Sequence, residues 1–218
     1  MTDAGTAVAV AGLTQRIGGR TVLALDAWTV PEGGRALLRG PSGSGKTTLL
    51  HILAGLSPDA QGEVRVLGQD PRVLRPAARD RWRGRHVGIV FQSLHLVRAL
   101  DVLGNLRLAG FLAGTRPEAA ELHRLLAAVG LADRARARPA ELSQGEAQRV
   151  AIARAVVARP RLILADEPTS ALDDASCIAV LGLLDKVAGE AGATLVVATH
   201  DGRLAGRFAT ALELEAVG

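Results

Sequence analysis

The sequence contains few aromatic residues and only one cysteine among its 218 residues. Aromatic side chains make up 2% of the chain and tyrosine is absent, so we expect a core built from Leu, Val, Ile and Ala. The single cysteine, Cys177, excludes an internal disulfide and is typical of a reducing compartment. Because Cys177 lies in an apolar helical pattern, we expect it to be a buried core residue rather than a reactive thiol.

Long hydrophobic runs are absent as well. No apolar run approaches the roughly 20 residues that a membrane-spanning helix requires. Runs such as "RLILA" and "TLVVA" have the length of strands. The N-terminus lacks a basic region followed by an apolar core, which predicts that no signal peptide is present. The sequence therefore predicts a globular chain without a membrane-spanning segment of its own.

Basic residues outnumber acidic residues in the sequence. The formal net charge is +4, and all the basic residues except Lys46 and Lys186 are arginine. This excess is compatible with binding to nucleic acid or to an anionic membrane surface. The densest stretch, "RPAARDRWRGR" at residues 75–85, is interpreted first as a solvated face and second as a contact with a membrane surface or a partner. Charge alone does not separate these alternatives.

Short apolar runs alternate with longer periodic ones along the chain. Strands are predicted at residues 7–13, 35–39, 63–67, 87–91, 161–165, 194–198 and 211–215, and helices at 46–56, 117–128, 144–158, 174–188 and 201–207. The strands at 161–165 and 194–198 bracket a helix and are apolar throughout, which is typical of a parallel sheet covered by helices. Residues 93–157 contain no convincing strand. We predict an α/β core, residues 1–92 and 158–218, with an inserted helical lobe at about 93–157.

The stretch "GPSGSGKTT" at residues 40–48 follows a predicted strand and opens a predicted helix, so it matches the phosphate-binding pattern G-x-x-x-x-G-K-[ST] in its required context. Its glycines allow successive backbone N–H groups to face one anion. Lys46 supplies a mobile charge for the β- and γ-phosphates, and the Thr47 hydroxyl can ligate Mg²⁺. The expected ATP-binding residues of the loop are Gly40, Pro41, Ser42, Gly43, Ser44, Gly45, Lys46, Thr47 and Thr48.

Two acidic residues end the apolar strand of "RLILADEP", residues 161–168. Asp166 is placed to hold the shell of a Mg²⁺ ion. Glu167 is then placed to orient and deprotonate a water that attacks a γ-phosphate. The alternative is a helix N-cap pair followed by Pro168, but the upstream phosphate loop favours the catalytic interpretation.

Two more predicted strands end in polar residues. Gln92 ends "VGIVFQ" and is a neutral group that can reach Mg²⁺ or the attacking water, although a glutamine there is often only a turn residue. His200 ends "VVATHDG", and the alternative is a structural histidine. Because ligands bind at the carboxyl ends of parallel strands, the catalytic interpretation is favoured for His200. The remaining histidines show no metal-ligand spacing: His51, His86, His95 and His123.

The stretch "LSQGEAQRVAIARA" at residues 142–155 begins with a helix-capping pattern. Ser143 can cap the helix, and Glu146 completes a capping box. Capping does not explain Gly145, which costs roughly 1 kcal/mol relative to alanine inside a helix. A donor-rich, flexible helix end therefore requires a target elsewhere.

Six segments, in this order, resemble the ATP-binding cassette of ABC transporters: "GPSGSGKTT", "VFQ", "LSQGEAQR", "ILADEP", "SALD" and "VATHD". The resemblance covers nearly the whole chain and implies a single domain with a P-loop NTPase core. It implies a mainly parallel sheet, an N-terminal antiparallel β portion and an inserted α-helical lobe. "GIVFQSLHLVRALDVLGNL" and "ELSQGEAQRVAIARA" look closest to a branch of small exporters that includes the lipoprotein-release and macrolide-export ATPases.

The resemblance also implies roles for individual residues. In this family two cassettes dimerise head to tail, and the signature segment of one, here Ser143, Gln144, Gly145 and Glu146, points at the γ-phosphate bound by the other. Ser170 and Asp173 match the loop that crosses the dimer interface, His200 matches the switch histidine, and Gln92 matches the glutamine linked to the helical lobe. Two residues depart from the pattern: Gln144 stands where glycine is usual, and Ile17 stands where an aromatic residue often stacks on adenine.

The leading hypothesis is therefore an ATPase with ATP and Mg²⁺ as its cofactors, paired with a second copy of itself and with an integral membrane permease. Such a subunit would lie peripherally at the cytoplasmic face of the membrane, and no nucleic acid is expected as a partner. The alternative is a soluble ABC-type ATPase that acts on nucleic acid or the ribosome, which the basic charge favours slightly. A small-molecule kinase would share only the phosphate loop and has no place for the signature and switch-histidine segments.

Overall fold

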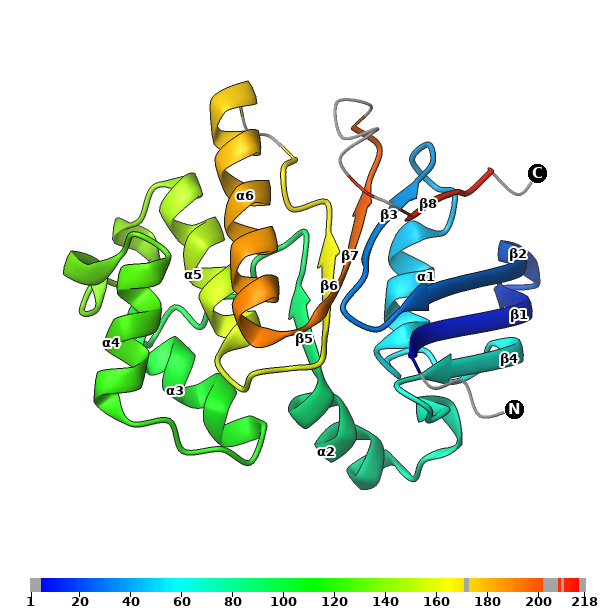
Figure 1. Ribbon diagram of the computed structural model, residues 1–218, viewed down its shortest axis with the longest axis horizontal. Coiled ribbons are helices and arrows are strands. Elements are labelled where there is room, and N and C mark those ends of the chain that lie inside the picture. Colours follow the sequence, from blue (N-terminus) through cyan, green and yellow to red (C-terminus); the bar gives the residue numbers. More distant parts are fainter. Residues whose placement is uncertain (1–4, 171–172, 202–207, 209, 216–218) are drawn as a thin grey trace.

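A computed structural model describes residues 5–170, 173–201, 208 and 210–215, and its strands form two sheets (Figure 1). The antiparallel sheet has the order β2-β1-β4 and consists of β1 (Thr6–Ile17), β2 (Arg20–Pro31) and β4 (Gln61–Val66). The parallel sheet has the order β5-β6-β7-β3-β8 and consists of β3 (Arg35–Arg39), β5 (Val87–Val90), β6 (Leu162–Asp166), β7 (Thr194–Thr199) and β8 (Thr210–Glu213). The expected α/β fold, with both kinds of sheet, is confirmed.

The helices are α1 (Lys46–Leu53), α2 (Pro76–His86), α3 (Val102–Leu112), α4 (Ala119–Ala128), α5 (Gln144–Val156) and α6 (Asp174–Ala191). Short 3₁₀ helices lie at Pro71–Val73, Ala132–Arg134 and Pro139–Glu141. Between β5 and β6 the chain, which is described throughout that stretch, forms helices and turns but no strand. Helices α3 and α4 lie on the side of the molecule away from the antiparallel sheet (Figure 1).

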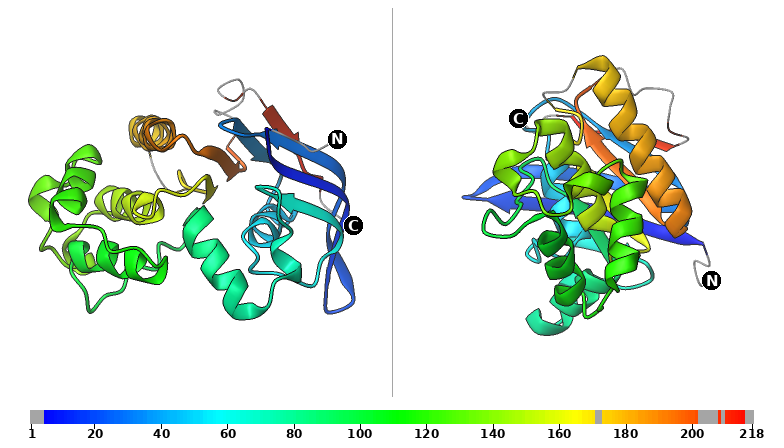
Figure 2. Two further views of the ribbon diagram at one scale, coloured as in Figure 1. Left: turned by 60° about the horizontal axis from the view of Figure 1, so that its bottom comes forward. Right: turned by 90° about the vertical axis from the view of Figure 1, so that its left-hand side faces the viewer.

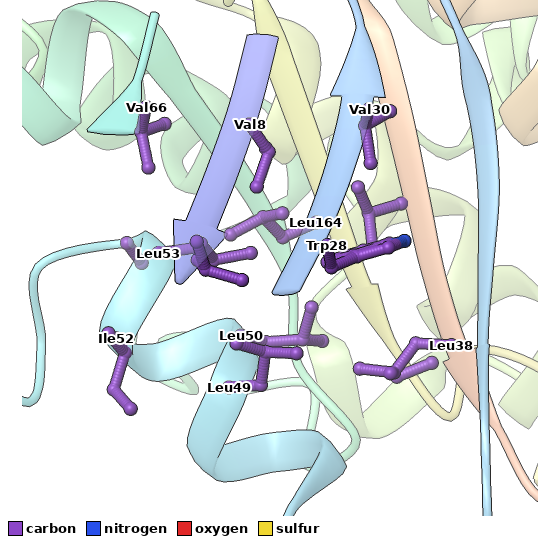
Figure 3. Close-up of a cluster of buried hydrophobic side chains, with 14 of the residues drawn as sticks. Val8, Trp28, Val30, Leu38, Leu49, Leu50, Ile52, Leu53, Val66 and Leu164 are labelled. Atoms are coloured by element: carbon purple, nitrogen blue, oxygen red, sulfur yellow. The ribbon is translucent and has the colours of Figure 1, made fainter. Parts of the chain in front are cut away.

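Helix α1 lies between the two sheets and organises the largest apolar cluster. Its leucines meet Val8 and Trp28 of the antiparallel sheet and Leu38 and Leu164 of the parallel sheet (Figure 3). On the other face of the parallel sheet, α5 and α6 bury a second cluster (Figure 2). Strands β6 and β7 are consequently buried along their whole length. This two-sided cover explains why their sequences are apolar at every position rather than at alternate positions.

Several elements differ from the sequence-based expectation. Strand β2 was not predicted, because two consecutive exposed residues, Asp26 and Ala27, interrupt the alternation of buried and exposed positions that indicates a strand. The arginine-rich stretch 75–85 is mostly helix α2, none of whose residues is buried. The helix predicted at 201–207 lies outside the described residues, apart from Asp201.

Cys177 is buried in the cluster beneath α6, as expected. None of the helices that the structure describes is long and apolar enough to cross a membrane.

Candidate active site

A cleft of about 630 Å³ gathers side chains from both sheets beside the carboxyl ends of the parallel strands. Its lining comprises Ile17, Val22, Ser42, Gly43, Gly45, Lys46, Thr47, Thr48, Gln92, Glu167 and His200. These residues come from the turn side of β1 and β2, from the loop before α1, and from the ends of β5, β6 and β7. The fold thus brings into one cavity segments that are widely separated in the sequence.

The glycines of the loop at residues 40–48 adopt backbone conformations that side chains disfavour. Gly43 and Gly45 have φ angles of 82° and 93°. A Cβ atom at Gly45 would lie 2.7 Å from the backbone oxygen of Val22, so the loop and β2 approach too closely for a side chain. Gly45 is also the N-cap of α1, so the positive end of this helix lies at the loop. This arrangement is suited to binding an anion.

Lys46 is buried, and its ammonium group lies inside the loop. Nζ donates to the backbone oxygens of Gly40 at 2.8 Å and of Pro41 at 2.9 Å. It also forms an ion pair with Glu167, 3.7 Å from Oε1. The charge of Lys46 is therefore balanced by carbonyl dipoles and by one carboxylate, and an incoming anion can take the place of either.

Thr47 and Asp166 form an oxygen-rich pair at the start of α1 and the end of β6. The Thr47 hydroxyl donates to Asp166 Oδ2 at 2.8 Å. The second oxygen of Asp166, Oδ1, is buried and accepts no hydrogen bond from the described residues. Burial raises the pKa of the Asp166 carboxyl above its usual value, and the neighbouring Glu167 charge adds to the rise. A hydroxyl beside a carboxylate with an unused oxygen fits Mg²⁺, which prefers oxygen ligands.

Glu167 is held on all sides. Its φ angle is 46°, which is unusual for a residue with a side chain, and its backbone N–H donates to the Ala198 carbonyl at 2.8 Å. Oε1 lies 2.9 Å from Nδ1 of His200, and Oε2 accepts from the Thr199 hydroxyl at 3.2 Å. The His200 side chain is 64% exposed, whereas that of Glu167 is 9% exposed. The carboxylate is thus fixed at the cleft wall, while the imidazole remains accessible.

Two residues of the site were not predicted from the sequence. Thr199 is fully buried, and its hydroxyl accepts from the Asp201 N–H at 3.0 Å while it donates to Glu167. Thr199 belongs to the same motif as His200, but a threonine at the end of an apolar strand is typical of strands and does not by itself indicate a role in a site. Val22 lines the cleft from β2, a strand that the sequence pattern did not reveal.

Gln92 and Ile17 line the cleft at its rim. Gln92 is exposed and follows β5 by two residues. Ile17 is 61% exposed at the end of β1 and lines the cleft together with Val22 of the next strand. Ser170 does not line the cleft, and its N–H and hydroxyl donate to the Glu167 carbonyl at 3.1 Å and 3.0 Å.

The N-terminus of α5 forms a separate, local arrangement. Ser143 Oγ accepts from the Glu146 N–H at 3.2 Å, and Glu146 Oε2 accepts from the Ser143 N–H at 2.8 Å, so the predicted capping box is present. The Ser143 N–H lowers the pKa of the Glu146 carboxyl, and Arg134 contributes. None of the signature residues, all of which the structure describes, lines the cleft: Ser143, Gln144, Gly145 and Glu146. Asp173 caps α6 by accepting from the Ser176 N–H at 2.9 Å, and residues 171–172 lie outside the described residues.

The fold and cleft define a class, the ATP-binding cassette ATPases. The family described as ABC transporter matches residues 25–170, and the chain belongs to that family. The resemblance inferred from the six motifs is therefore confirmed.

Relatives of known name place the chain among ATP-binding proteins of transport systems. It is 44% identical over 200 residues to the lipoprotein-releasing system ATP-binding protein LolD of Chromohalobacter salexigens, covering 89% of this chain and 84% of the relative. It is 40% identical to the macrolide export ATP-binding/permease protein MacB of Rhodopseudomonas palustris, covering 97% of this chain and 33% of that longer protein. A nucleic-acid or ribosome factor is not favoured by these relatives.

Solved structures of one cassette match the whole fold. A dimeric post-hydrolysis structure of the ATP-binding cassette MJ0796, bound to ADP and Pi, has a TM-score of 0.85 and 31% identity, covering 97% of this chain and 99% of the other. A second dimeric structure of MJ0796, a bacterial ABC transporter cassette, has a TM-score of 0.84 and 32% identity, covering 96% and 94%. The chain is thus a nucleotide-binding ATPase of the family.

Proposed function

We propose that this chain is the ATP-hydrolysing subunit of an ABC transporter, which powers a separate membrane permease when ATP binding joins two copies. The observation that carries the proposal is one cleft that contains Lys46, the Thr47–Asp166 pair and the Glu167–His200 pair. The similarity to LolD and MacB favours export as the direction of transport. The subunit then lies peripherally at the cytoplasmic face of the membrane.

The loop at residues 40–48 binds the phosphates of ATP. Its backbone N–H groups and the N-terminus of α1 supply fixed partial charges, and Lys46 supplies a full one. In the described structure Lys46 donates to the carbonyls of Gly40 and Pro41. Phosphate oxygens replace these acceptors on binding, and because they are charged they form stronger hydrogen bonds.

Mg²⁺ fits the oxygen atoms of Thr47 and Asp166, and Gln92, which lines the same cleft, would contact this ion or the attacking water. The unused Oδ1 of Asp166 is the atom that carries this assignment. The ion, when bound, neutralises charge on the β- and γ-phosphates. Because an ionised carboxylate is the form that binds a cation, the ion also offsets the burial that raises the pKa of Asp166.

Glu167 acts as the general base for hydrolysis. It accepts a proton from the attacking water, which then attacks the γ-phosphorus in line with the leaving oxygen. Thr199 and His200 fix the carboxylate from two sides. His200 is exposed toward the cleft and is placed to donate to the γ-phosphate.

Ile17 contacts the adenine base at the rim of the cleft. An isoleucine offers apolar contact area but no aromatic face for stacking. We therefore expect weak discrimination between ATP and GTP, with hydrolysis rates within roughly tenfold of each other, because a stacking contact is worth about 1–3 kcal/mol per base.

The signature residues serve the nucleotide of a second copy. Ser143 and Gly145 lie at a helix N-terminus, which is a ready anion site, yet they do not line the cleft of their own chain. The two solved relatives with the same fold are dimers. Gln144 is exposed beside them. Ser170 and Asp173 lie in the segment that crosses the interface between the copies.

The permease docks at an apolar groove of about 550 Å³ between α2 and α3. Its lining includes Leu56, Val97 and Leu112, all exposed large hydrophobic residues of the kind that mark an interaction site. Phe91 lines this groove, while the next residue, Gln92, lines the nucleotide cleft. A permease segment bound in the groove would therefore lie next to the site of hydrolysis.

We place the helical lobe at about residues 93–157 and the core at 1–92 and 158–218, within a single domain.

Lysine substitution tests the assignment of the cleft. Lys46→Ala removes the one mobile charge of the loop, so ATP binding is expected to be lost almost entirely. Lys186→Ala is the matched control, because Lys186 is an exposed lysine on α6 that pairs only weakly with Glu190, at 4.0 Å. Nucleotide titration of both variants gives the answer: near-normal affinity in Lys46→Ala would show that the loop is not the binding site.

A further inference from the structure

On helix α5, Arg154 is a cation whose hydrogen bonds, within the part of the chain that the structure describes, go to backbone carbonyls. The guanidinium of Arg154 donates from one terminal nitrogen to the His95 carbonyl at 2.7 Å and from the other to the Leu94 carbonyl at 2.7 Å. Among the described residues no carboxylate forms an ion pair with it. Arg154 is half-buried, and burial lowers its pKa. A cation placed in this way costs desolvation, which the two short hydrogen bonds offset.

The loop that Arg154 holds is the wall between two cavities. Phe91, His95 and Arg154 line the groove beside α2 and α3, whereas Gln92 lines the nucleotide cleft. The Phe91 ring packs edge-on between two imidazoles, with ring centroids 6.2 Å from His51 and 5.4 Å from His95. His95 has a φ angle of 48°, so the backbone turns sharply where Arg154 binds it.

The far end of the same loop is fixed by α3. The amide of Asn105 is buried, accepts from the Val97 N–H at 2.8 Å and donates to the Val97 carbonyl at 3.2 Å. Residues 94–97 are therefore tied at one end to α5 and at the other to α3. The position of Gln92, two residues before Leu94, depends on these ties, because the Gln92 side chain forms no hydrogen bond within the described residues.

We propose that Arg154 is a positioning residue for hydrolysis, which holds the loop after Gln92 against α5 so that the Gln92 amide stays in the nucleotide cleft. This inference rests on the proposed role of Gln92 in that cleft. Ser143 and Arg154 lie on one helix, about 16 Å apart at a rise of 1.5 Å per residue. A displacement of α5 at its signature end is therefore transmitted to Gln92 through the guanidinium.

The first test compares Arg154→Met with Arg159→Met. Methionine keeps much of the side-chain volume but has no donors, and Arg159 is an exposed arginine that pairs with Glu121 instead of the loop. In Arg154→Met we expect kcat for ATP hydrolysis to fall roughly 2- to 30-fold, the range of coupling effects for residues that do not touch ligand. The affinity for ATP without Mg²⁺ is expected to be unchanged. Hydrogen exchange at residues 92–97 is expected to accelerate while the thermal melt matches that of Arg159→Met.

A double-mutant cycle with Gln92→Ala separates positioning from general destabilisation. If Arg154 acts through Gln92, Arg154→Met lowers kcat no further once Gln92 is alanine. Additive effects would overturn the proposal, and so would unchanged exchange at residues 92–97. If Gln92→Ala alone leaves kcat unchanged while the wild type hydrolyses ATP, the role of Gln92 fails and the ATPase assignment stands.

Arg154→Lys covers the case in which Arg154→Met does not fold. Lysine keeps the charge and can reach one carbonyl, but it lacks the fork that binds two at once. We expect a smaller fall in kcat and a smaller rise in exchange than for methionine. Wild-type values of both in Arg154→Lys would show that the forked contact does not position Gln92.

Discussion

The nucleotide cleft and the N-terminus of α5 are built in opposite ways. In the cleft, Lys46, Asp166 and Glu167 are all buried. Asp166 at the end of β6 accepts from Thr47 of α1, 119 residues earlier in the sequence, and Glu167 contacts Thr199 at the end of β7 and His200 directly after it. At α5, Ser143 is exposed and hydrogen-bonds with Glu146 of the same turn, and Glu146 also accepts from Arg134, which lies outside the turn.

The difference shows what each region requires in order to form. The cleft depends on the tertiary fold, because its lining residues come from several separate segments of the chain. The α5 terminus is hydrogen-bonded mainly within its own capping box, so the helix N-terminus is available to a nucleotide bound by a second copy. Variants in the two regions should therefore both lose turnover but differ in whether ATP joins two copies into a dimer.

The largest effect is expected for Glu167→Gln, within the cleft. Glutamine keeps the shape and can still accept from Thr199, but it is a very poor base, so turnover is expected to fall by about 10²- to 10⁴-fold. ATP binding should survive, because Lys46 and Thr47 are intact, and an ATP-bound dimer should accumulate. Single-turnover hydrolysis and gel filtration with ATP measure the two effects. Wild-type hydrolysis would remove Glu167 from the catalytic role.

Ser143→Arg applies the same test to the α5 terminus. A bulky cation there is expected to block the approach of a facing nucleotide, so ATP binds to the monomer with near wild-type affinity while dimers do not form. Hydrolysis should then fall to near background. Nucleotide titration, gel filtration in a Glu167→Gln background and a thermal melt measure the three consequences.

A purely structural role for Ser143 makes a different prediction. Loss of an N-cap costs about 0.5–2 kcal/mol of stability and leaves dimerisation intact. Dimers at wild-type yield would therefore overturn the assignment of Ser143 to a partner's nucleotide. Loss of ATP binding in a folded monomer would overturn it as well.

Ile17→Tyr probes the rim of the cleft, where the site is least enclosed. An aromatic face at this position should tighten ATP binding roughly tenfold, since base stacking is worth about 1–3 kcal/mol. Ile17→Leu is the control, because it changes shape without adding a π face. An unchanged dissociation constant in Ile17→Tyr would show that residue 17 does not contact the base.

The sequence predicted the local motifs well and the long-range contacts poorly. The loop at 40–48, the buried strands β6 and β7 and the α5 capping box each carry their signal within a dozen residues. Thr199 and Val22 were missed because their roles arise only when β7 and β2 reach the cleft. The clamp by Arg154 was missed for the same reason, since its acceptors are backbone carbonyls about 60 residues away, which leave no side-chain pattern.

Asp166→Asn is expected to stabilise the protein in the absence of nucleotide and Mg²⁺. Burial raises the pKa of Asp166, so ionisation costs the folded state stability as pH rises through the interval between the unfolded and folded pKa values. Asparagine avoids that cost and can still accept from Thr47, giving a gain of about 0.5–2 kcal/mol near neutral pH. Thermal melts measure the gain, and hydrolysis should be lost. A lower melting temperature in Asp166→Asn would contradict the account of the buried carboxylate.

The smallest effect on stability is expected for a substitution at Glu146. The pKa of Glu146 is lowered, whereas that of Asp166 is raised, so the two carboxyls change the stability in opposite directions as pH rises. The Ser143 N–H and Arg134 favour the ionised carboxylate, so its contribution to stability is present above the unfolded pKa and is lost as pH falls through the folded pKa. Glu146→Gln keeps an oxygen for the capping box but has no charge to titrate. The melting temperature of the variant should therefore fall less than that of the wild type between neutral pH and the acid range. Equal falls would show that the capping box of α5 does not depend on charge, and the two regions would then differ in burial alone.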